Sequence, residues 1–230
     1  MDRFGQLVEA TRADHAQHIL KNPLIRKLAA GEVTHDLYAV YLGQTYQLVR
    51  HTSRALALAA ARLPDERRAL RAWFLEQAQE EHGHELFCIT DLKNLGLDPA
   101  RVLECGPLPG AWGLYTQNYY MADHGNPAAI LGVATATEGM GAELAGGMAQ
   151  LLVERYGVPA TAVTFLRSHA GFDQRHLEQA RRAINELALE TDLPGILHAR
   201  RMTFRYYGRL FEDVSESTER YFFRSTLAAA

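Results

Sequence analysis

Three side chains that can bind a transition metal recur at a spacing that a helix brings together. His169, Asp173 and His176 lie four and then three residues apart. At about 3.6 residues per turn, this spacing places all three on one helix face. Phe165 and Phe172 share the face, so His169 and Asp173 are expected to point inward. Two imidazoles and a carboxylate on one face are typical of a transition-metal site.

A second pair of potential ligands lies upstream, in the charged stretch of residues 80–85. Glu81 and His84 form a Glu-x-x-His pair, which carboxylate-bridged di-metal bundles carry on their core helices. We expect these two side chains to face the interior, and the remaining charged residues of the stretch, Glu80, His82 and Glu85, to face outward.

A third potential ligand, Glu138, stands in a segment of small and apolar residues that includes Val133, Ala136 and Met140. Burying an unpaired carboxylate costs roughly several kcal/mol, so Glu138 must be paired, protonated or bound to a metal. Metal ligation is favoured, and an arginine partner from a neighbouring helix is the alternative. For residues 80–85 and 169–176 the alternative is an exposed charged surface, which is typical of such runs.

The rest of the chain also shows helical periodicity, and strand patterns are absent. Helices are expected at about residues 3–20, 34–63, 65–95, 127–156, 160–190 and 195–223, and a short one is opened by Asn22-Pro23 and closed by Gly31. Proline and glycine breaks separate them, and a frayed tail follows at 227–230. The chain has 230 residues, 47% of them hydrophobic, which is enough for one sizeable core. The sequence therefore predicts an all-α single domain over residues 1–230, built as a bundle of seven or eight helices.

Composition argues against several classes of protein. The formal net charge of −3 comes from interspersed acids and bases, so no nucleic-acid partner is expected. No apolar run reaches the roughly 18 residues that a membrane span needs, so no membrane partner is expected. Cys88 and Cys105 have no partner motif, and the N-terminal residues lack the apolar core of a signal peptide. A cytoplasmic, reducing location is therefore expected.

Several stretches resemble the haem-oxygenase-like di-iron oxidases, whose wider superfamily includes thiaminase and pyrroloquinoline-quinone synthase type proteins. The stretches are residues 22–34, 44–52, 80–86 and 91–96, and the resemblance extends over about residues 20–190. It implies a haem-oxygenase-like helical fold and two bound iron(II) ions. Carried over residue by residue, the ligand set it implies is Glu81, His84, Glu138, His169, Asp173 and His176.

The resemblance also implies an activity. The two iron(II) ions would activate O₂ to oxidise a small organic substrate, carboxylate- or amine-bearing, in a buried central cavity. Glu81, Glu138 and Asp173 would be the catalytic carboxylates, and Glu138 or Asp173 would bridge the ions. An external reductant and a homodimeric assembly are expected. The last helix offers candidates for anchoring a substrate carboxylate, although a solvated basic face is favoured for them: Arg200, Arg201 and Arg205 with Tyr206 and Tyr207.

Two glutamines depart from the pattern of this family. Its members place a further acid either near Gln47 or about two turns before the histidine, where this chain has Gln77. A ligand set with less negative charge binds iron less tightly, which predicts one tightly and one weakly held ion. His51, one turn beyond Gln47 on the same face, is the alternative ligand.

Two further functions stay open. Residues 7–15 resemble the segment of haem oxygenase that carries the proximal histidine, here His15, and residues 143–147 resemble its glycine-rich distal helix. A haem oxygenase would leave five of the potential iron ligands without a role: Glu81, His84, His169, Asp173 and His176. The other alternative is a catalytically inactive metal-binding bundle, which the two glutamines favour.

Overall fold

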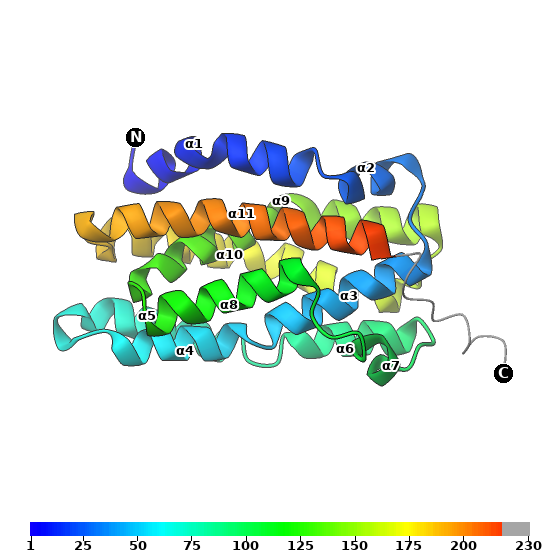
Figure 1. The fold of residues 1–230 in the computed structure, drawn as a ribbon, viewed down its shortest axis with the longest axis horizontal. Helices are drawn as coiled ribbons and strands as arrows, with labels where there is room; N and C mark the ends of the chain where they lie inside the picture. The colour runs from blue at the N-terminus through cyan, green and yellow to red at the C-terminus, as the bar shows by residue number, and fades with distance from the viewer. Residues whose placement is uncertain (218–230) are drawn as a thin grey trace.

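The helices lie side by side along the long axis of the molecule, with α1 and α2 on one side and α4 to α7 on the other (Figure 1). This computed structural model describes residues 1–217, and they contain helices and no strand, which confirms the all-α fold. The α-helical segments are α1 (Arg3–His15), α2 (Pro23–Ala30), α3 (His35–Val49), α4 (Thr52–Arg62), α5 (Arg68–Glu80), α6 (Glu85–Asn94), α7 (Pro99–Leu103), α8 (Pro109–Asp123), α9 (Ile130–Tyr156), α10 (Thr164–Leu187) and α11 (Leu193–Glu216).

Two of the expected long helices are each divided in the structure. The segment expected at 34–63 breaks at Arg50 and His51 into α3 and α4, and the segment expected at 65–95 breaks at residues 81–84 into α5 and α6. With the short α7, these breaks bring residues 1–217 to eleven α-helical segments. The expected end of the last helix at residue 223 and the tail at 227–230 lie outside the described residues.

Short polar side chains begin the helices where the sequence has its turn residues. Asn22 caps α2 by accepting from the Leu24 amide, and Thr34 caps α3 by accepting from the Leu37 amide. These caps satisfy amide groups that have no partner within the helix. The chain therefore turns at the positions that its proline, glycine and capping residues indicate.

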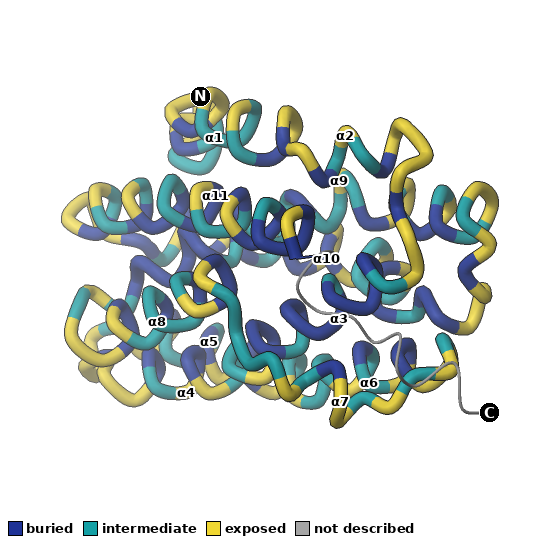
Figure 2. Tube along the Cα trace, turned by 45° about the vertical axis from the view of Figure 1, so that its right-hand side comes forward, coloured by how far each residue is buried: buried dark blue, intermediate teal, exposed yellow. Residues whose placement is uncertain are grey.

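The central helix α9 packs along α10 and α11. Its small residues permit the close approach, because a Cβ atom built on Gly132 would lie 2.1 Å from the carbonyl oxygen of Ile196 in α11. Any side chain at Gly132 would push these two helices apart. Residues of α3 are also largely buried, whereas α1 and α2 present exposed residues to solvent (Figure 2). The middle of the bundle is thus formed by α3, α9 and α11.

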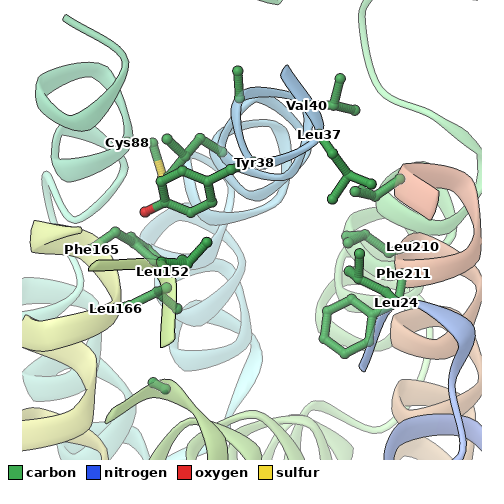
Figure 3. Close-up of a cluster of buried hydrophobic side chains, with 14 of the residues drawn as sticks. Leu24, Leu37, Tyr38, Val40, Cys88, Leu152, Phe165, Leu166, Leu210 and Phe211 are labelled. Carbon is green, nitrogen blue, oxygen red and sulfur yellow. The ribbon is translucent and has the colours of Figure 1, made fainter. Parts of the chain in front are cut away.

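The first turn of α10 is fixed by a buried carboxylate. Asp91 in α6 accepts hydrogen bonds from the Thr164 amide at 2.8 Å and from the Phe165 amide at 2.9 Å. In Figure 3, Phe165 and Leu166 lie near Tyr38 and Cys88, within the larger hydrophobic core cluster. This packing holds the start of α10, and His169 follows one turn later.

Among residues 1–217, no helix combines the length and apolar composition that crossing a bilayer would need.

Candidate metal centre

A non-helical turn carries the first pair of expected ligands. Helix α5 ends at Glu80, α6 begins at Glu85, and Gly83 between them has a φ of +89°. Glycine adopts this conformation without the steric cost that other residues incur, so the chain breaks here. Glu81 and His84 therefore lie on the turn and not on a continuous helix, yet Glu81 Oε2 is 3.2 Å from His84 Nδ1.

Glu138 of α9 lies near Glu81. Gly141 lies one turn further along α9. A Cβ atom built on Gly141 would lie 1.5 Å from Asp173 Oδ2, so the carboxyl group of Asp173 occupies the space that this glycine leaves. Glu138 raises the pKa of the Asp173 carboxyl group, so the second and third expected ligand segments interact here.

The ring of His169 is held with one nitrogen available for a ligand. Its Nδ1 lies 2.8 Å from the carbonyl oxygen of Phe165. A carbonyl only accepts, so Nδ1 carries the proton and Nε2 keeps its lone pair. The ring stacks on Phe165 with centroids 4.0 Å apart, and its centroid lies 5.2 Å from that of His84. This is the arrangement that metal-binding histidines commonly have.

His176 joins two of the carboxylates. Its Nδ1 lies 3.4 Å from Glu81 Oε1 and 3.5 Å from Glu138 Oε2, and its side chain is only 2% exposed. One ligand atom from each of Glu81, Glu138 and His176 lies within 4.8 Å of the others. Metal–ligand bonds are about 2 Å long, so three atoms at this spacing need only small movements to bind one ion.

The protonation of these groups reflects three carboxyl groups buried together. Burial and the neighbouring Glu138 raise the pKa of Asp173 to about 9. Burial also raises the pKa of Glu138, against the effect of His176. Burial acts on Glu81 in the same direction, but His84 and His176 outweigh it, and the pKa of Glu81 is lowered. Burial opposes the charged form of His176, but the surrounding carboxylates prevail and raise its pKa.

The donor set fits a cation. Within residues 1–217, Asp173 Oδ1 and His84 Nδ1 are both buried and form no hydrogen bond, although Glu81 Oε2 lies 3.2 Å from His84 Nδ1. Buried polar atoms without partners are rare in folded proteins. A metal ion would satisfy both atoms and would compensate the clustered carboxylates. A mixed set of carboxylates and imidazoles suits iron and related transition metals.

A cavity of about 150 Å³ adjoins this cluster, and Glu81, Glu138, His169 and Asp173 form part of its wall. The remaining wall is mostly apolar and comes from α3, α4, α5, α8, α9, α10 and α11. A cavity of about 150 Å³ can hold a molecule of roughly the size of benzene. The cluster is thus placed to act on a small molecule inside the bundle.

The two glutamines have different surroundings. Gln77 is buried, lines the cavity one turn before Glu81 and donates to Gln179 Oε1 at 3.2 Å. Gln47 is buried within α3, but the α3 wall of the cavity consists of Tyr41, Leu48 and Val49. The glutamine that faces the site is therefore Gln77.

Two groups of candidate residues from the sequence lie away from the cavity. The His51 side chain contacts Tyr119, with Nδ1 3.0 Å from the phenol oxygen, and it does not line the cavity within residues 1–217. The last-helix arginines also lie away from the cavity wall that these residues form. Arg201 and Arg205 form ion pairs with Asp14, and Arg200 packs against Phe4 and Phe204.

His15, the expected proximal ligand of a haem, points elsewhere. Its Nε2 lies 3.3 Å from Glu143 Oε2, and its ring packs against Phe204 with centroids 5.1 Å apart. Burial lowers the pKa of His15. Within residues 1–217 the cavity wall does not include His15, so this geometry does not favour haem ligation.

Two side chains at the centre differ from their expected placement. Glu80, expected to face outward, places Oε2 2.9 Å from His176 Nε2. The Phe172 ring, 37% exposed, stacks near His84 and His176 with centroids 5.7 and 6.4 Å apart. Helical periodicity could not assign Glu80, because the helix ends at that residue. Phe172 follows the pattern of α10, but its position over His84 depends on the turn at residues 81–84.

The fold places the chain in the class of haem-oxygenase-like helical proteins. A domain of unknown function with a haem oxygenase-like fold from Shewanella denitrificans superposes with a TM-score of 0.84 at 22% identity, over 95% of this chain and 94% of that chain. A protein from Sulfolobus solfataricus described as a TenA-like thiaminase gives 0.70 at 15% identity, over 94% and 97%. Haem oxygenase from Leptospira interrogans gives 0.63 at 14% identity, over 93% and 100%.

Residues 39–208, more than half of the chain, match the iron-containing redox enzyme family, and the protein belongs to that family. Comparison with curated proteins gave no match. The matched range contains all six of the ligands that the sequence predicts, from Glu81 to His176.

Proposed function

We propose that this protein is a non-haem di-iron enzyme that uses O₂ to oxidise a small organic substrate in the cavity between its helices. The observation that carries the proposal is the buried cluster of carboxylates and imidazoles on the cavity wall, in which Asp173 Oδ1 has no hydrogen-bond partner among residues 1–217. Membership of the iron-containing redox enzyme family supports iron as the metal. The residues that would hold two iron(II) ions are Glu81, His84, Glu138, His169, Asp173 and His176.

When bound, iron(II) supplies the electrons that O₂ needs to become an oxidant. The chain supplies ligands, orientation and exclusion of water. Glu81, Glu138 and Asp173 are the proposed catalytic carboxylates. With iron bound, Glu138 of α9 and Asp173 of α10 would help to hold it, since their carboxyl groups interact. The Nδ1–H group of His169 donates to the Phe165 carbonyl, which leaves Nε2 available to a ligand, and His169 lines the cavity.

The cavity favours a small substrate with a largely apolar body. Its wall includes Leu48, Val133, Met140, Leu144 and Phe165, and no lysine or arginine of residues 1–217 contributes to it. A carboxylate or amine on the substrate would therefore meet the metal, the site carboxylates or neutral polar groups, and not a cationic anchor. The cavity wall therefore does not support the arginines of the last helix as an anchor for the substrate.

Oxygen consumption tests the proposal. Anaerobically purified protein is loaded with iron(II), mixed with oxygenated buffer, and followed with an oxygen electrode, with metal-free protein and the Glu138→Ala variant as controls. The proposal predicts O₂ uptake that depends on iron and is lost in the variant. Iron binding without O₂ uptake would indicate the inactive metal-binding bundle, and a Soret band with haem turnover after addition of haemin would indicate haem oxygenase.

Thiaminase activity is measured in the same experiment, because a thiaminase-like protein has a similar fold. A TenA-like thiaminase shares the fold with this chain at low identity. Cleavage of thiamin by the metal-free protein, with no oxygen uptake after iron loading, would contradict the proposal and would favour a hydrolytic function.

A further inference from the structure

Glu80 contacts His176 on the side of the ring that faces away from the other carboxylates. Its Oε2 lies 2.9 Å from His176 Nε2, whereas His176 Nδ1 faces Glu81 at 3.4 Å and Glu138 at 3.5 Å. The two nitrogens of this ring therefore have separate partners. Nε2 is directed at Glu80, and Nδ1 is directed at the proposed metal ligands.

The 2.9 Å contact between Glu80 and His176 Nε2 determines which nitrogen of His176 would keep its proton when the ring binds a metal. An ionised carboxylate only accepts hydrogen bonds, so His176 Nε2 must carry hydrogen to donate to Glu80. A metal-bound imidazole has one nitrogen on the metal and a proton on the other. Donation from Nε2 to Glu80 thus leaves Nδ1 for the metal, on the side where Glu81 and Glu138 lie.

Arg175 fixes Glu80 from the solvent side. Its Nη2 lies 3.3 Å from the same Oε2 and 3.3 Å from His176 Nε2. An arginine has no acceptor atom, so Arg175 cannot accept a hydrogen bond from the protonated Nε2 of His176. Arg175 Nη2 and His176 Nε2 therefore both donate to the Glu80 carboxylate. The Arg175 side chain is 59% exposed, so its ion pair with Glu80 is a weak contributor compared with the contact to the buried imidazole.

The end of α5 explains why two adjacent acids reach opposite sides of one ring. Glu80 is the last residue of α5, and Glu81 is the first residue of the turn toward Gly83. The change of backbone direction separates their side chains. Glu80 reaches the outer nitrogen of His176, and Glu81 reaches the inner nitrogen and lines the cavity.

We infer that Glu80 is a positioning residue, which orients His176 and strengthens it as a metal ligand through a carboxylate–histidine–metal triad; this inference rests on the proposed function. Partners of this kind fix the tautomer and the orientation of a ligating imidazole and raise its donor strength. Glu80 binds no metal itself and contacts no substrate.

The test compares Glu80→Ala, Glu80→Gln and the matched control Glu76→Ala, an exposed acid one turn earlier on α5 that forms no ion pair within residues 1–217. The measured quantities are the iron(II) affinity, from anaerobic competition with a chromophoric chelator, and the melting temperature of the metal-free protein. Glutamine keeps an acceptor oxygen for Nε2–H, whereas alanine does not.

We expect Glu80→Ala to weaken iron binding by about 10- to 100-fold. Glu80→Gln should recover most of this loss, Glu76→Ala should match the wild type, and the melting temperatures should stay close. Wild-type affinity in Glu80→Ala, or an equal loss in Glu76→Ala, would overturn the inference while leaving the proposed function intact. Absence of iron binding by the wild type would overturn the proposed function and this inference with it.

Discussion

Gly141 and Asp173 occupy the same space: a Cβ atom on the glycine would lie 1.5 Å from Oδ2 of the aspartate. The pair joins α9 to α10 one turn beyond Glu138. Since the Asp173 carboxyl group is only 3% exposed, it has little room to move aside. The position of the Asp173 carboxyl group therefore requires a glycine at residue 141.

Gly141→Ala should displace the Asp173 carboxyl group and reduce the number of iron ions bound per chain. The matched control is Gly139→Ala on the same helix, where a Cβ atom would meet nothing within 4 Å. Alanine has the higher helix propensity, so the control should be as stable as the wild type or more stable, by up to about 1 kcal/mol. Iron content by elemental analysis and helical circular dichroism check both. Unchanged iron content in Gly141→Ala would contradict the assignment of Asp173 as a ligand.

The Phe172 ring should slow the exchange of metal and water at the centre. It lies over His84 and His176 and within 6.5 Å of the His169 ring, centroid to centroid, at the surface of the bundle. Phe172→Ala should accelerate iron loss to an excess of chelator by about tenfold or more, because the apolar groups around a metal control solvent access. Leu75→Ala removes a comparably exposed apolar side chain from α5 and serves as the control. Equal release rates in the two variants would show that Phe172 is no barrier.

Asp173 should make the stability of the metal-free protein depend on pH. Its pKa is raised to about 9, well above the ordinary value of 3.8, so between these values the folded state binds the proton more strongly than the unfolded state. The free energy of unfolding should then fall as pH rises, by at most about 1.4 kcal/mol per pH unit for one proton. His176, whose pKa is also raised, acts in the same direction.

Asp173→Asn removes this titration and should flatten the decline between about pH 7 and 8.5. This pH range lies above the ordinary pKa of histidine. The pKa of His169 is lowered further, so its titration contributes little to the pH dependence of stability in this range. Urea unfolding of metal-free wild type and variant at several pH values measures the difference. Parallel stability curves would contradict a raised Asp173 pKa in the folded protein.

Gln77 is the residue at which an added carboxylate should strengthen iron binding. It lines the cavity one turn before Glu81, and Gln77→Glu would add a negative charge to the ligand cluster. Iron(II) affinity in an anaerobic titration should rise, chiefly for the weaker ion. Gln47→Glu is the control, since Gln47 is buried away from the cavity wall and an acid there should lower stability without a gain in affinity. A gain from Gln47→Glu alone would show that α3 completes the site.

The sequence predicts the all-α fold because periodic apolar residues and proline or glycine breaks are local features. The spacing of His169, Asp173 and His176 also needs only one regular helix. In the structure His176 lies beside Glu138, Glu138 raises the pKa of Asp173, and His169 lines the same cavity as Glu138. The break at Gly83 is different. The predicted helix carried Glu81 and His84 inward and Glu80 outward, whereas the turn brings Glu80 to His176.

Tertiary contacts decide the remaining differences. His51 and the arginines of α11 have residue types that suit a site, but their partners come from distant segments. Tyr119 of α8 contacts His51, and Asp14 of α1 pairs with Arg201 and Arg205. No local pattern in the sequence encodes these pairings. The homodimer and the external reductant stay predictions.

The most direct test of the central claim is anomalous X-ray diffraction at the iron absorption edge, from crystals soaked anaerobically with iron(II). The account predicts two peaks in each chain, enclosed by Glu81, His84, Glu138, His169, Asp173 and His176, with His176 bound through Nδ1. Well-diffracting soaked crystals without a peak among these six residues, or with iron bound elsewhere, for instance between His15 and Glu143, would contradict it.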